Sequence, residues 1–303
     1  MANKVMIVGT GNVGMSYAYA LIHQRSTVGE LVLVDINTAD AEGEAIDLSD
    51  TLAVAPQQLK IHSGTYAEAG DCDLIVITAG VPQKPGETRM DLLKKNASIF
   101  KSMISQIMES GFKGIFLVVS NPVDVLAYLA WKYSGLPPER VIGSGTVLDS
   151  ARLRHAVAQR LELSPKSVHA YQIGEHGDTE FAIWSRAHIG GQPVTNFLST
   201  DELSQIEDYA RNEAYTIIEK KGATYYGIGA CMALISGCIL NDEKRILPVS
   251  NYDALSDTYN GYPAVVGRSG VVRRIGHDIT AQEQVKFDRS IKALQEAIKL
   301  AQS

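Results

Sequence analysis

The histidine best placed for chemistry lies in the segment GEHGD at residues 174–178. Glycines on both sides let the backbone approach a ligand closely, and a histidine such as His176 donates or accepts a proton near neutral pH. Taken alone, His176 could equally be a surface or core histidine. A second segment, LDSAR at 148–152, carries Asp149 and Arg152 three residues apart, on one face of a predicted helix. This carboxylate and guanidinium could point to a common site.

A glycine-rich turn near the start of the chain predicts a nucleotide site. The apolar run 5–8 leads into GTGNVG at 9–14 and then into a helix of small residues. Gly9 allows a tight turn, Gly11 lets the backbone approach a pyrophosphate, and Gly14 lets the helix lie close to the strand. The start of the helix supplies N–H groups and a positive dipole end for phosphates.

An acidic residue at the end of the next predicted strand selects the nucleotide. Asp35 follows Gly14 by 21 residues. Its carboxylate can accept both ribose hydroxyls and would repel a 2′-phosphate, so NAD is favoured over NADP. The glycine motif alone is a weak signal. The strand before it, the helix after it and the acid at this spacing make the dinucleotide fingerprint specific.

A further polar segment, AGVPQKPGETR at 79–89, follows the buried run 74–77. Two prolines and two glycines exclude regular helix or a central strand. The segment is therefore a loop, and it carries an amide, Gln83, and a guanidinium, Arg89.

The order of the elements predicts an α/β protein. In the first half, helical patterns alternate with six apolar runs, at 5–8, 31–34, 59–62, 74–77, 115–119 and 141–142. That alternation is typical of a parallel sheet with helices on both faces. The second half mixes predicted helices (149–162, 201–220, 223–240, 281–301) with predicted strands (168–173, 246–251, 264–275). Ser164 with Pro165 predicts a helix start, and Ser199 with Glu202 and Thr280 with Glu283 have capping-box spacing.

Composition excludes several classes of partner. The 303 residues are 45% hydrophobic and 20% charged, with a net charge of −6 and no basic cluster, so neither nucleic acid nor an anionic membrane is an expected partner. No signal peptide and no apolar run of transmembrane length is seen. Cys72, Cys231 and Cys238 lack disulfide or metal spacing, and the last two are expected in a helix core. This indicates a reducing cytoplasm.

These motifs, with SNPVD at 120–124 and KGATYYG at 221–227, resemble the lactate/malate dehydrogenase family in type and order over nearly the whole chain. The resemblance implies an α/β fold with a Rossmann doubly wound parallel sheet in an NAD-binding domain, 1–145, followed by a mixed α/β substrate domain, 146–303. It implies a homotetramer and NADH-dependent, reversible reduction of pyruvate to L-lactate. The cofactor contacts implied are Gly9, Gly11, Asn12, Val13, Gly14, Asp35, Ala79, Gly80 and Asn121.

The resemblance also assigns catalytic roles. His176 resembles the proton donor to the carbonyl oxygen of pyruvate, and Asp149 resembles its carboxylate partner, which favours the imidazolium. Arg152 resembles the residue that holds the substrate carboxylate through a two-pronged ion pair. Arg89 resembles the loop arginine that polarises the carbonyl, and Asn121 a hydrogen-bonding residue near it.

The loop at 79–89 is expected to act as a lid that brings Arg89 onto the substrate and excludes water. Gln83 should face the far end of the substrate, where a neutral amide suits the methyl of pyruvate and an arginine would suit a second carboxylate. Glu87 should repel dicarboxylates, and Thr224 resembles a lactate-type pocket residue. The Val81-Pro82 pair also resembles malate enzymes, but Gln83 and Thr224 outweigh it. Malate or a bulkier 2-hydroxy acid stays an alternative substrate.

Two residues outside this site resemble an effector site. In family members activated by fructose 1,6-bisphosphate, an arginine and a histidine at the places of Arg154 and His169 line an anion site on a subunit two-fold axis. Alternatives from other classes are a non-catalytic NAD-binding or structural protein and a metal-assisted, NAD-dependent glycosidase. The latter needs a metal, and no histidine, cysteine or aspartate cluster has ligand spacing; His169, His176 and His188 have no obvious shared face.

Overall fold

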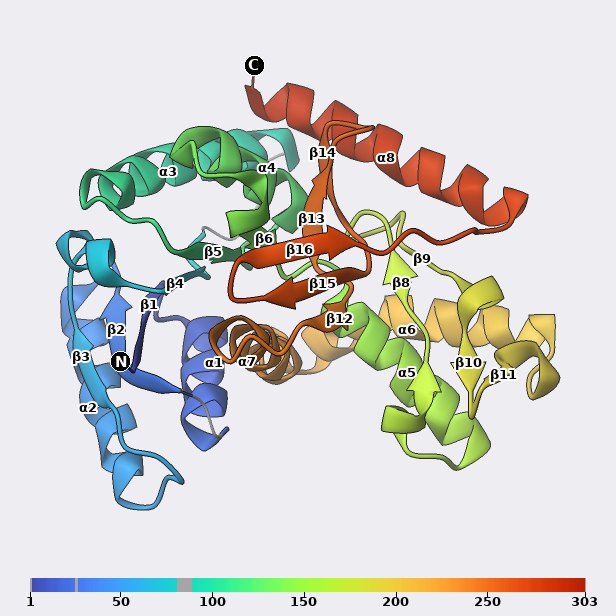
Figure 1. Ribbon diagram of the computed structural model, residues 1–303, viewed down its shortest axis with the longest axis horizontal. Coiled ribbons are helices and arrows are strands. Elements are labelled where there is room, and N and C mark those ends of the chain that lie inside the picture. Colours follow the sequence, from blue (N-terminus) through green and yellow to red (C-terminus); the bar gives the residue numbers. More distant parts are fainter. Residues whose placement is uncertain (1, 25–26, 81–88, 303) are drawn as a thin grey trace.

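The computed structural model describes residues 2–24, 27–80 and 89–302. Its main feature is an eight-stranded sheet with the order β14-β13-β6-β5-β4-β1-β2-β3 (Figure 1). The six strands from the first half pair in parallel, which confirms the predicted parallel sheet. They are β1 (Asn3–Val8), β2 (Val28–Val34), β3 (Lys60–Ser63), β4 (Leu74–Ile77), β5 (Ile115–Val118) and β6 (Val141–Gly143).

The central strands β1, β4 and β5 are buried on both faces of the sheet because they consist almost entirely of apolar residues. In β1, Val5 and Ile7 point to one side, and Met6 and Val8 point to the other. The first side packs against α1 and α7, and the second packs against α3, α4 and α8 (Figure 1). The bounds of the helices are α1 (Asn12–His23), α2 (Thr38–Asp50), α3 (Arg89–Glu109), α4 (Val123–Ser134), α5 (Val147–Leu161), α6 (Thr200–Lys221), α7 (Tyr226–Leu240) and α8 (Ala281–Gln302).

The C-terminal half supplies two strands to the same sheet. β13 (Ser250–Asp253) pairs antiparallel with β6, and β14 (Thr258–Gly261) pairs with β13. The main sheet therefore contains strands from both sides of the predicted domain boundary between residues 145 and 146. The predicted strand 246–251 is wrong as one element: β12 (Arg245–Leu247) and β13 belong to different sheets. Pro248 lies between them and has no N–H to donate to a continuous ladder.

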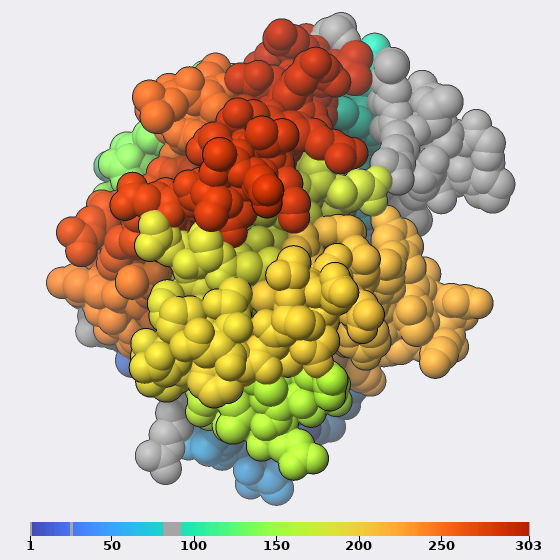
Figure 2. Space-filling model, turned by 90° about the vertical axis from the view of Figure 1, so that its right-hand side faces the viewer, coloured from blue at the N-terminus to red at the C-terminus, as the bar shows by residue number. Residues whose placement is uncertain are grey.

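Two other predicted strands also divide. The run 168–173 forms β7 (Val168–His169) and β8 (Gln172–Ile173) in separate small sheets, and 264–275 forms a hairpin of β15 (Ala264–Gly267) and β16 (Gly270–Arg274). The remaining strands are β9 (Phe181–Ala182), β10 (His188–Ile189) and β11 (Gln192–Pro193). Seen from the side of this half, segments coloured yellow-green to red form most of the visible surface (Figure 2).

The capping signals in the sequence are confirmed. The Ser199 hydroxyl accepts from the Glu202 N–H at the start of α6, and Thr280 does the same for Glu283 at the start of α8. Ser164 accepts from the N–H of Lys166, but it begins a short 3₁₀ turn, Pro165–Ser167, rather than an α-helix.

The predicted chemistry gathers at one edge of the main sheet. The loops after β1, β4, β5 and β6 all leave the carboxyl ends of parallel strands, which lie at the same edge. Ligands of open α/β sheets bind outside this edge. α5 begins directly after β6 and so carries Asp149 and Arg152 to the same place.

Candidate active site

A cavity of about 550 Å³ lies at the carboxyl edge of the sheet. Its wall combines the start of α1 and the loops after β4, β5 and β6 with residues of α3, α5, α6 and α7 and the segment before α7. Six of the residues predicted from the sequence line it: Val13, Gly80, Asn121, Arg152, His176 and Thr224. Apolar residues from the second half, Ala214, Ile218 and Ile228, complete the wall, and no periodic signal in the sequence marks them as site residues.

His176, Asp149 and Arg152 form one hydrogen-bonded group. The imidazole Nδ1 donates to Asp149 Oδ2 at 2.7 Å, and the Arg152 Nη1 donates to Asp149 Oδ1 at 3.2 Å. The Asp149 side chain is 4% exposed, whereas that of His176 is 27% exposed. Since Nδ1 is held by the carboxylate, the other ring nitrogen is free to face a ligand in the cavity.

The charges of this group favour a cationic histidine. The negative charge of Asp149 raises the pKa of His176 to about 10, against the opposing effect of burial. Burial by itself would raise the pKa of Asp149, but the charges of His176 and Arg152 outweigh it, so the pKa of Asp149 is lowered. His176 can therefore give up a proton to a ligand at neutral pH while Asp149 stays ionised.

The backbone of His176 is fixed by a second carboxylate. The His176 N–H donates to Asp124 Oδ2 at 2.8 Å, and the Ser250 hydroxyl donates to Asp124 Oδ1. Burial raises the pKa of Asp124 to about 6, although both hydrogen bonds oppose the shift. Asp124 belongs to the SNPVD motif at 120–124. From the sequence, a role was predicted only for Asn121 of this motif, and the role of Asp124 was missed.

A third carboxyl group lies beside the pair. Glu180 Oε2 is 3.8 Å from His176 Nδ1, and the side chain is 4% exposed. Burial and the neighbouring charge of Asp149 hold the pKa of Glu180 well above its usual range. The raised pKa favours the protonated form of Glu180, and its buried Oε2 has no hydrogen-bond partner among the described residues. Only the spacing of four residues from His176 could have suggested Glu180.

The glycine turn fits a dinucleotide. Gly9 has a φ of +104°, and a Cβ on Gly14 would lie 2.1 Å from the Gly9 carbonyl oxygen. A Cβ on Gly11 would meet no atom within 4 Å, so the loop is open where a pyrophosphate would approach. α1 begins at Asn12 with no side-chain cap, and the buried Thr10 hydroxyl has no partner in the described chain. These are free donors for an anion.

Asp35 lies next to this turn at the end of β2. Its Oδ2 accepts the Thr10 N–H at 2.8 Å, and its Oδ1 accepts the Asn37 N–H at 3.0 Å. Each carboxylate oxygen keeps a further acceptor position for a ribose hydroxyl. Ala79 leaves β4 beside the turn, where its N–H donates to the Val8 carbonyl.

Part of the predicted site lies outside the described residues. Gln83, Glu87 and the Val81-Pro82 pair fall in the interval 81–88. The backbone of Arg89 begins α3, but its side chain is not described. The predicted lid and its two recognition residues therefore stay predictions.

The two predicted effector residues lie on α5 and β7, away from the cavity lining. Arg154 is half-buried, and its Nε donates to the Ser150 carbonyl at 3.1 Å. His169 is exposed on β7, directly opposite His188 on β10 in an antiparallel pair. This cross-strand pair places the His169 and His188 side chains on the same face of the small sheet, which the sequence did not suggest. His176, by contrast, lies apart from them in the cavity.

The cysteines and the helices test the predictions about free thiols and membrane-spanning segments. Cys231 and Cys238 are buried in α7, as predicted, and the three thiols are unpaired. No helix within the described part of the chain is long and apolar enough to cross a membrane.

Both halves of the chain match models of a single protein family. Residues 3–143 match the NAD-binding domain of lactate/malate dehydrogenase, and residues 146–303 match its alpha/beta C-terminal domain. L-lactate dehydrogenase 2 of Bacillus cereus (strain ZK / E33L) is 51% identical over 306 aligned positions, which cover 98% of this chain and 97% of the relative.

Solved structures show the same likeness. The minor L-lactate dehydrogenase from Enterococcus mundtii, in its ligands-bound form, superposes with a TM-score of 0.96 at 46% identity over 98% of each chain. MGS-M5, a lactate dehydrogenase from a Medee basin deep-sea metagenome library, gives 0.97 at 48% identity over the full length of both chains.

Proposed function

The chain belongs to the lactate/malate dehydrogenase family, and we propose that it is an L-lactate dehydrogenase that reduces pyruvate reversibly with NADH. The observation that carries this proposal is the group of His176, Asp149 and Arg152 in the cavity beside the nucleotide turn. The activity carried by the curated relatives in Bacillus supports the same conclusion.

The substrate is held by charge. In this proposal the Arg152 guanidinium receives the carboxylate of pyruvate with two parallel hydrogen bonds. The ketone oxygen then faces His176, whose raised pKa keeps it protonated at neutral pH. As negative charge develops on that oxygen, His176 donates its proton. Asp149 stabilises the protonated ring before the transfer and keeps the neutral ring oriented after it. Asn121 lines the same cavity and hydrogen-bonds near the carbonyl.

NADH, when bound, supplies the hydride. The residues proposed to hold it are the turn at Gly9, Gly11 and Gly14, with Asp35 on the ribose. The free donors at the start of α1 suit its pyrophosphate. Asn12, Val13, Ala79, Gly80 and Asn121 complete the proposed contacts, and Val13, Gly80 and Asn121 line the cavity.

Substrate choice is proposed to depend on the loop. Gln83 would face the methyl group of pyruvate, Arg89 would polarise the carbonyl on closure, and Thr224 would close the pocket from the α7 side. Replacing Gln83 by arginine adds a partner for a second carboxylate and leaves an unpaired cation beside a methyl. Discrimination should therefore shift towards oxaloacetate by several kcal/mol.

The test of the whole proposal is NADH oxidation with pyruvate, oxaloacetate and 2-oxoisocaproate in parallel. Pyruvate should have the highest kcat/KM for the wild type, and Gln83→Arg should raise the value for oxaloacetate relative to pyruvate. A preference for oxaloacetate in the wild type makes the chain a malate enzyme. An absence of NADH oxidation with all three substrates leaves a non-catalytic NAD-binding protein.

We further propose fructose 1,6-bisphosphate as an activator of a homotetramer. Arg154 and His169, with His188 beside it, would meet their symmetry copies on a two-fold axis and receive two phosphates. α5 carries Arg154 as well as Asp149 and Arg152, which gives a direct mechanical route to substrate affinity. A lower half-saturation for pyruvate with millimolar fructose 1,6-bisphosphate, lost in Arg154→Gln, is the expected result. An unchanged half-saturation rejects the effector.

Three finer assignments complete the proposal. Residues 1–145 are assigned to cofactor binding and 146–303 to substrate binding, although β13 and β14 extend the first sheet. A cytoplasmic location is supported by three buried, unpaired thiols, which suit a reducing compartment. No nucleic-acid or membrane partner is proposed.

A further inference from the structure

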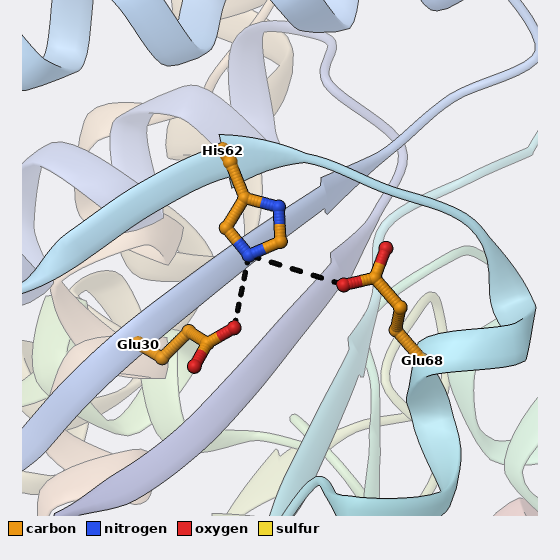
Figure 3. A group of neighbouring side chains, drawn as sticks. All are labelled: Glu30, His62 and Glu68. Carbon is orange, nitrogen blue, oxygen red and sulfur yellow. Dashed lines mark hydrogen bonds and ion pairs between the residues drawn. The ribbon is translucent and has the colours of Figure 1, made fainter.

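A second group of one histidine and two carboxylates lies at the outer edge of the main sheet. Its residues are distant in sequence from those of the catalytic group. Glu30 belongs to β2, His62 to the edge strand β3, and Glu68 to the 3₁₀ segment η2 (Tyr66–Asp71) that follows β3. The His62 Nε2 is 2.9 Å from Glu30 Oε1 and 3.9 Å from Glu68 Oε2. Figure 3 shows both carboxylates converging on this one ring nitrogen.

The other ring nitrogen of His62, Nδ1, is held by a backbone hydrogen bond. His62 Nδ1 lies 3.0 Å from the carbonyl oxygen of Ser63. A carbonyl only accepts, so Nδ1 carries a proton and donates. A proton on Nε2 can join the ring to Glu30 Oε1, which lies 2.9 Å away, and a metal ion that binds Nε2 would take the place of that proton between the two carboxylates. A histidine that donates one nitrogen to a backbone carbonyl and turns the other to carboxylates has the arrangement of metal-binding histidines.

Glu68 is also held in place before any ligand arrives. Its Oε1 accepts the Thr65 N–H at 3.2 Å in a capping box, which leaves Oε2 directed at His62. The three side chains are 25–36% exposed, so an ion from solvent can reach them. All three ligand atoms lie within 4.8 Å of one another.

We propose that Glu30, His62 and Glu68 form a binding site for a divalent transition-metal ion, with Zn²⁺ the best match. One imidazole and two carboxylates from three elements leave a fourth position for water, a common zinc geometry. Zinc bonds of about 2.0–2.2 Å in a tetrahedron separate ligand atoms by about 3.4 Å. The two observed distances lie on either side of this value, and the Glu30 and Glu68 oxygens lie within 4.8 Å of each other, so shifts of about 0.5–1.4 Å in surface side chains close the site.

Two lysines compete with the ion for Glu30. Lys4 Nζ and Lys60 Nζ lie 3.5 and 3.4 Å from Glu30 Oε1. Lys60 is mostly exposed, so its ion pair is weak and a divalent ion can displace it. Lys4 also pairs with Asp71, which gives it an alternative partner when Glu30 turns to the metal.

The bound ion would tie three elements together at an exposed edge. β3 has four residues and pairs only with β2 in the main sheet. A metal shared by β2, β3 and η2 adds a cross-link that the unfolded chain lacks, so it should stabilise the fold without entering the reaction.

The experiment is a Zn²⁺ titration of the tag-free, chelator-treated protein in its NADH complex, followed by calorimetry and metal analysis. One ion per chain is expected, with a rise in Tm of about 4 °C at 100-fold excess over Kd. His62→Gln and Glu68→Gln should weaken binding at least about tenfold. Glu68→Gln keeps the capping box, which accepts glutamine as well as glutamate. Both variants should keep wild-type kcat for pyruvate, which shows that they fold.

Two further variants make the result specific. His23→Gln removes an exposed histidine on α1 and should leave Kd unchanged. Lys60→Met frees Glu30 and should tighten binding by about two- to fivefold, an effect that adventitious surface binding would not show.

Three outcomes would overturn the site. The first is no Zn²⁺ binding to the wild type below millimolar concentration. The second is a Kd that His62→Gln and Glu68→Gln leave unchanged. The third is inhibition of pyruvate reduction with the same midpoint as binding, because the ion would then sit on Asp149, His176 and Glu180, whose ligand atoms also lie within 4.8 Å of one another.

Discussion

Two groups in this molecule have the same composition, a histidine between two carboxyl groups. In the cavity, His176 Nδ1 is 2.7 Å from Asp149 and 3.8 Å from Glu180. At the sheet edge, His62 Nε2 is 2.9 Å from Glu30 and 3.9 Å from Glu68. The distances are nearly equal, but the two cavity carboxyls are 4% exposed, whereas the two edge carboxyls are 29% and 36% exposed.

Burial gives the two groups opposite electrostatics. In the cavity, burial and the charge of Asp149 raise the pKa of Glu180, so one carboxyl is neutral and the other pairs with His176. At the edge, the hydrogen bond from His62 lowers the pKa of Glu30, and water solvates both carboxylates. The buried group therefore holds a proton ready for a substrate. The edge group presents two exposed carboxylates to an external cation, although Glu30 is also paired with Lys4 and Lys60.

The largest expected effect separates the two groups by activity. Asp149→Asn removes the charge that keeps His176 protonated and oriented, so kcat/KM for pyruvate should fall by about 10²–10⁴-fold. Glu30→Gln makes the matched change at the edge and should alter kcat/KM by less than about twofold. Steady-state NADH oxidation measures both. A comparable loss in Glu30→Gln would show that the edge group takes part in the reaction.

The pH dependence of substrate binding is the next largest effect. Pyruvate should bind the NADH complex whose His176 is protonated, so its KM should be level at neutral pH and rise about tenfold per pH unit above a pKa of about 10. Lactate oxidation should improve over the same range. In Asp149→Asn the supporting charge is lost, so the rise should begin at lower pH. A KM that falls steadily as pH increases would exclude His176 as the proton donor.

The cavity group could be predicted from the sequence because each part is marked locally. Glycines flank His176, and Asp149 and Arg152 are one helical turn apart. The alternating apolar runs of the first half likewise predicted β1 to β6 and their parallel pairing. These signals depend on residues close together in the chain.

The edge group could not be predicted because its members come from three elements whose alignment depends on strand register. Residues 30 and 60 are Cα partners in the β2–β3 ladder, and the histidine is two positions further on. The same reason hid the His169–His188 pair and the addition of β13 and β14 to the main sheet. Glu180 could not be predicted for a different reason: the raised pKa of its carboxyl results from burial, which the spacing of residues in the sequence does not reveal.

A smaller effect concerns that buried carboxyl. The folded pKa of Glu180 is raised above its unfolded value, so the stability it contributes is present at low pH and is lost as pH rises through the folded pKa. Glu180→Gln cannot ionise and keeps a neutral side chain of nearly the same size. The variant should therefore gain stability relative to the wild type as pH rises from about 4.5 towards neutral, by roughly 1 kcal/mol.

Urea unfolding at a series of pH values, with protein concentration held constant, measures this gain. Activity at neutral pH should stay within about tenfold of the wild type, since the side chain beside Asp149 and His176 stays neutral. A stability difference that does not change with pH would mean that Glu180 is ionised in the folded protein.

The smallest expected effect belongs to the edge group without metal. His62→Gln, measured in chelator, should change the free energy of unfolding by no more than about 1 kcal/mol, because exposed ion pairs contribute little and salt screens them. Any loss should shrink further at high salt. The same variant in saturating Zn²⁺ should lack the stabilisation that the ion gives the wild type. A large loss of unfolding free energy in chelator would instead make His62 a structural cation between Glu30 and Glu68. His62 would then not be the exposed, ligand-binding counterpart of the buried, reactive His176.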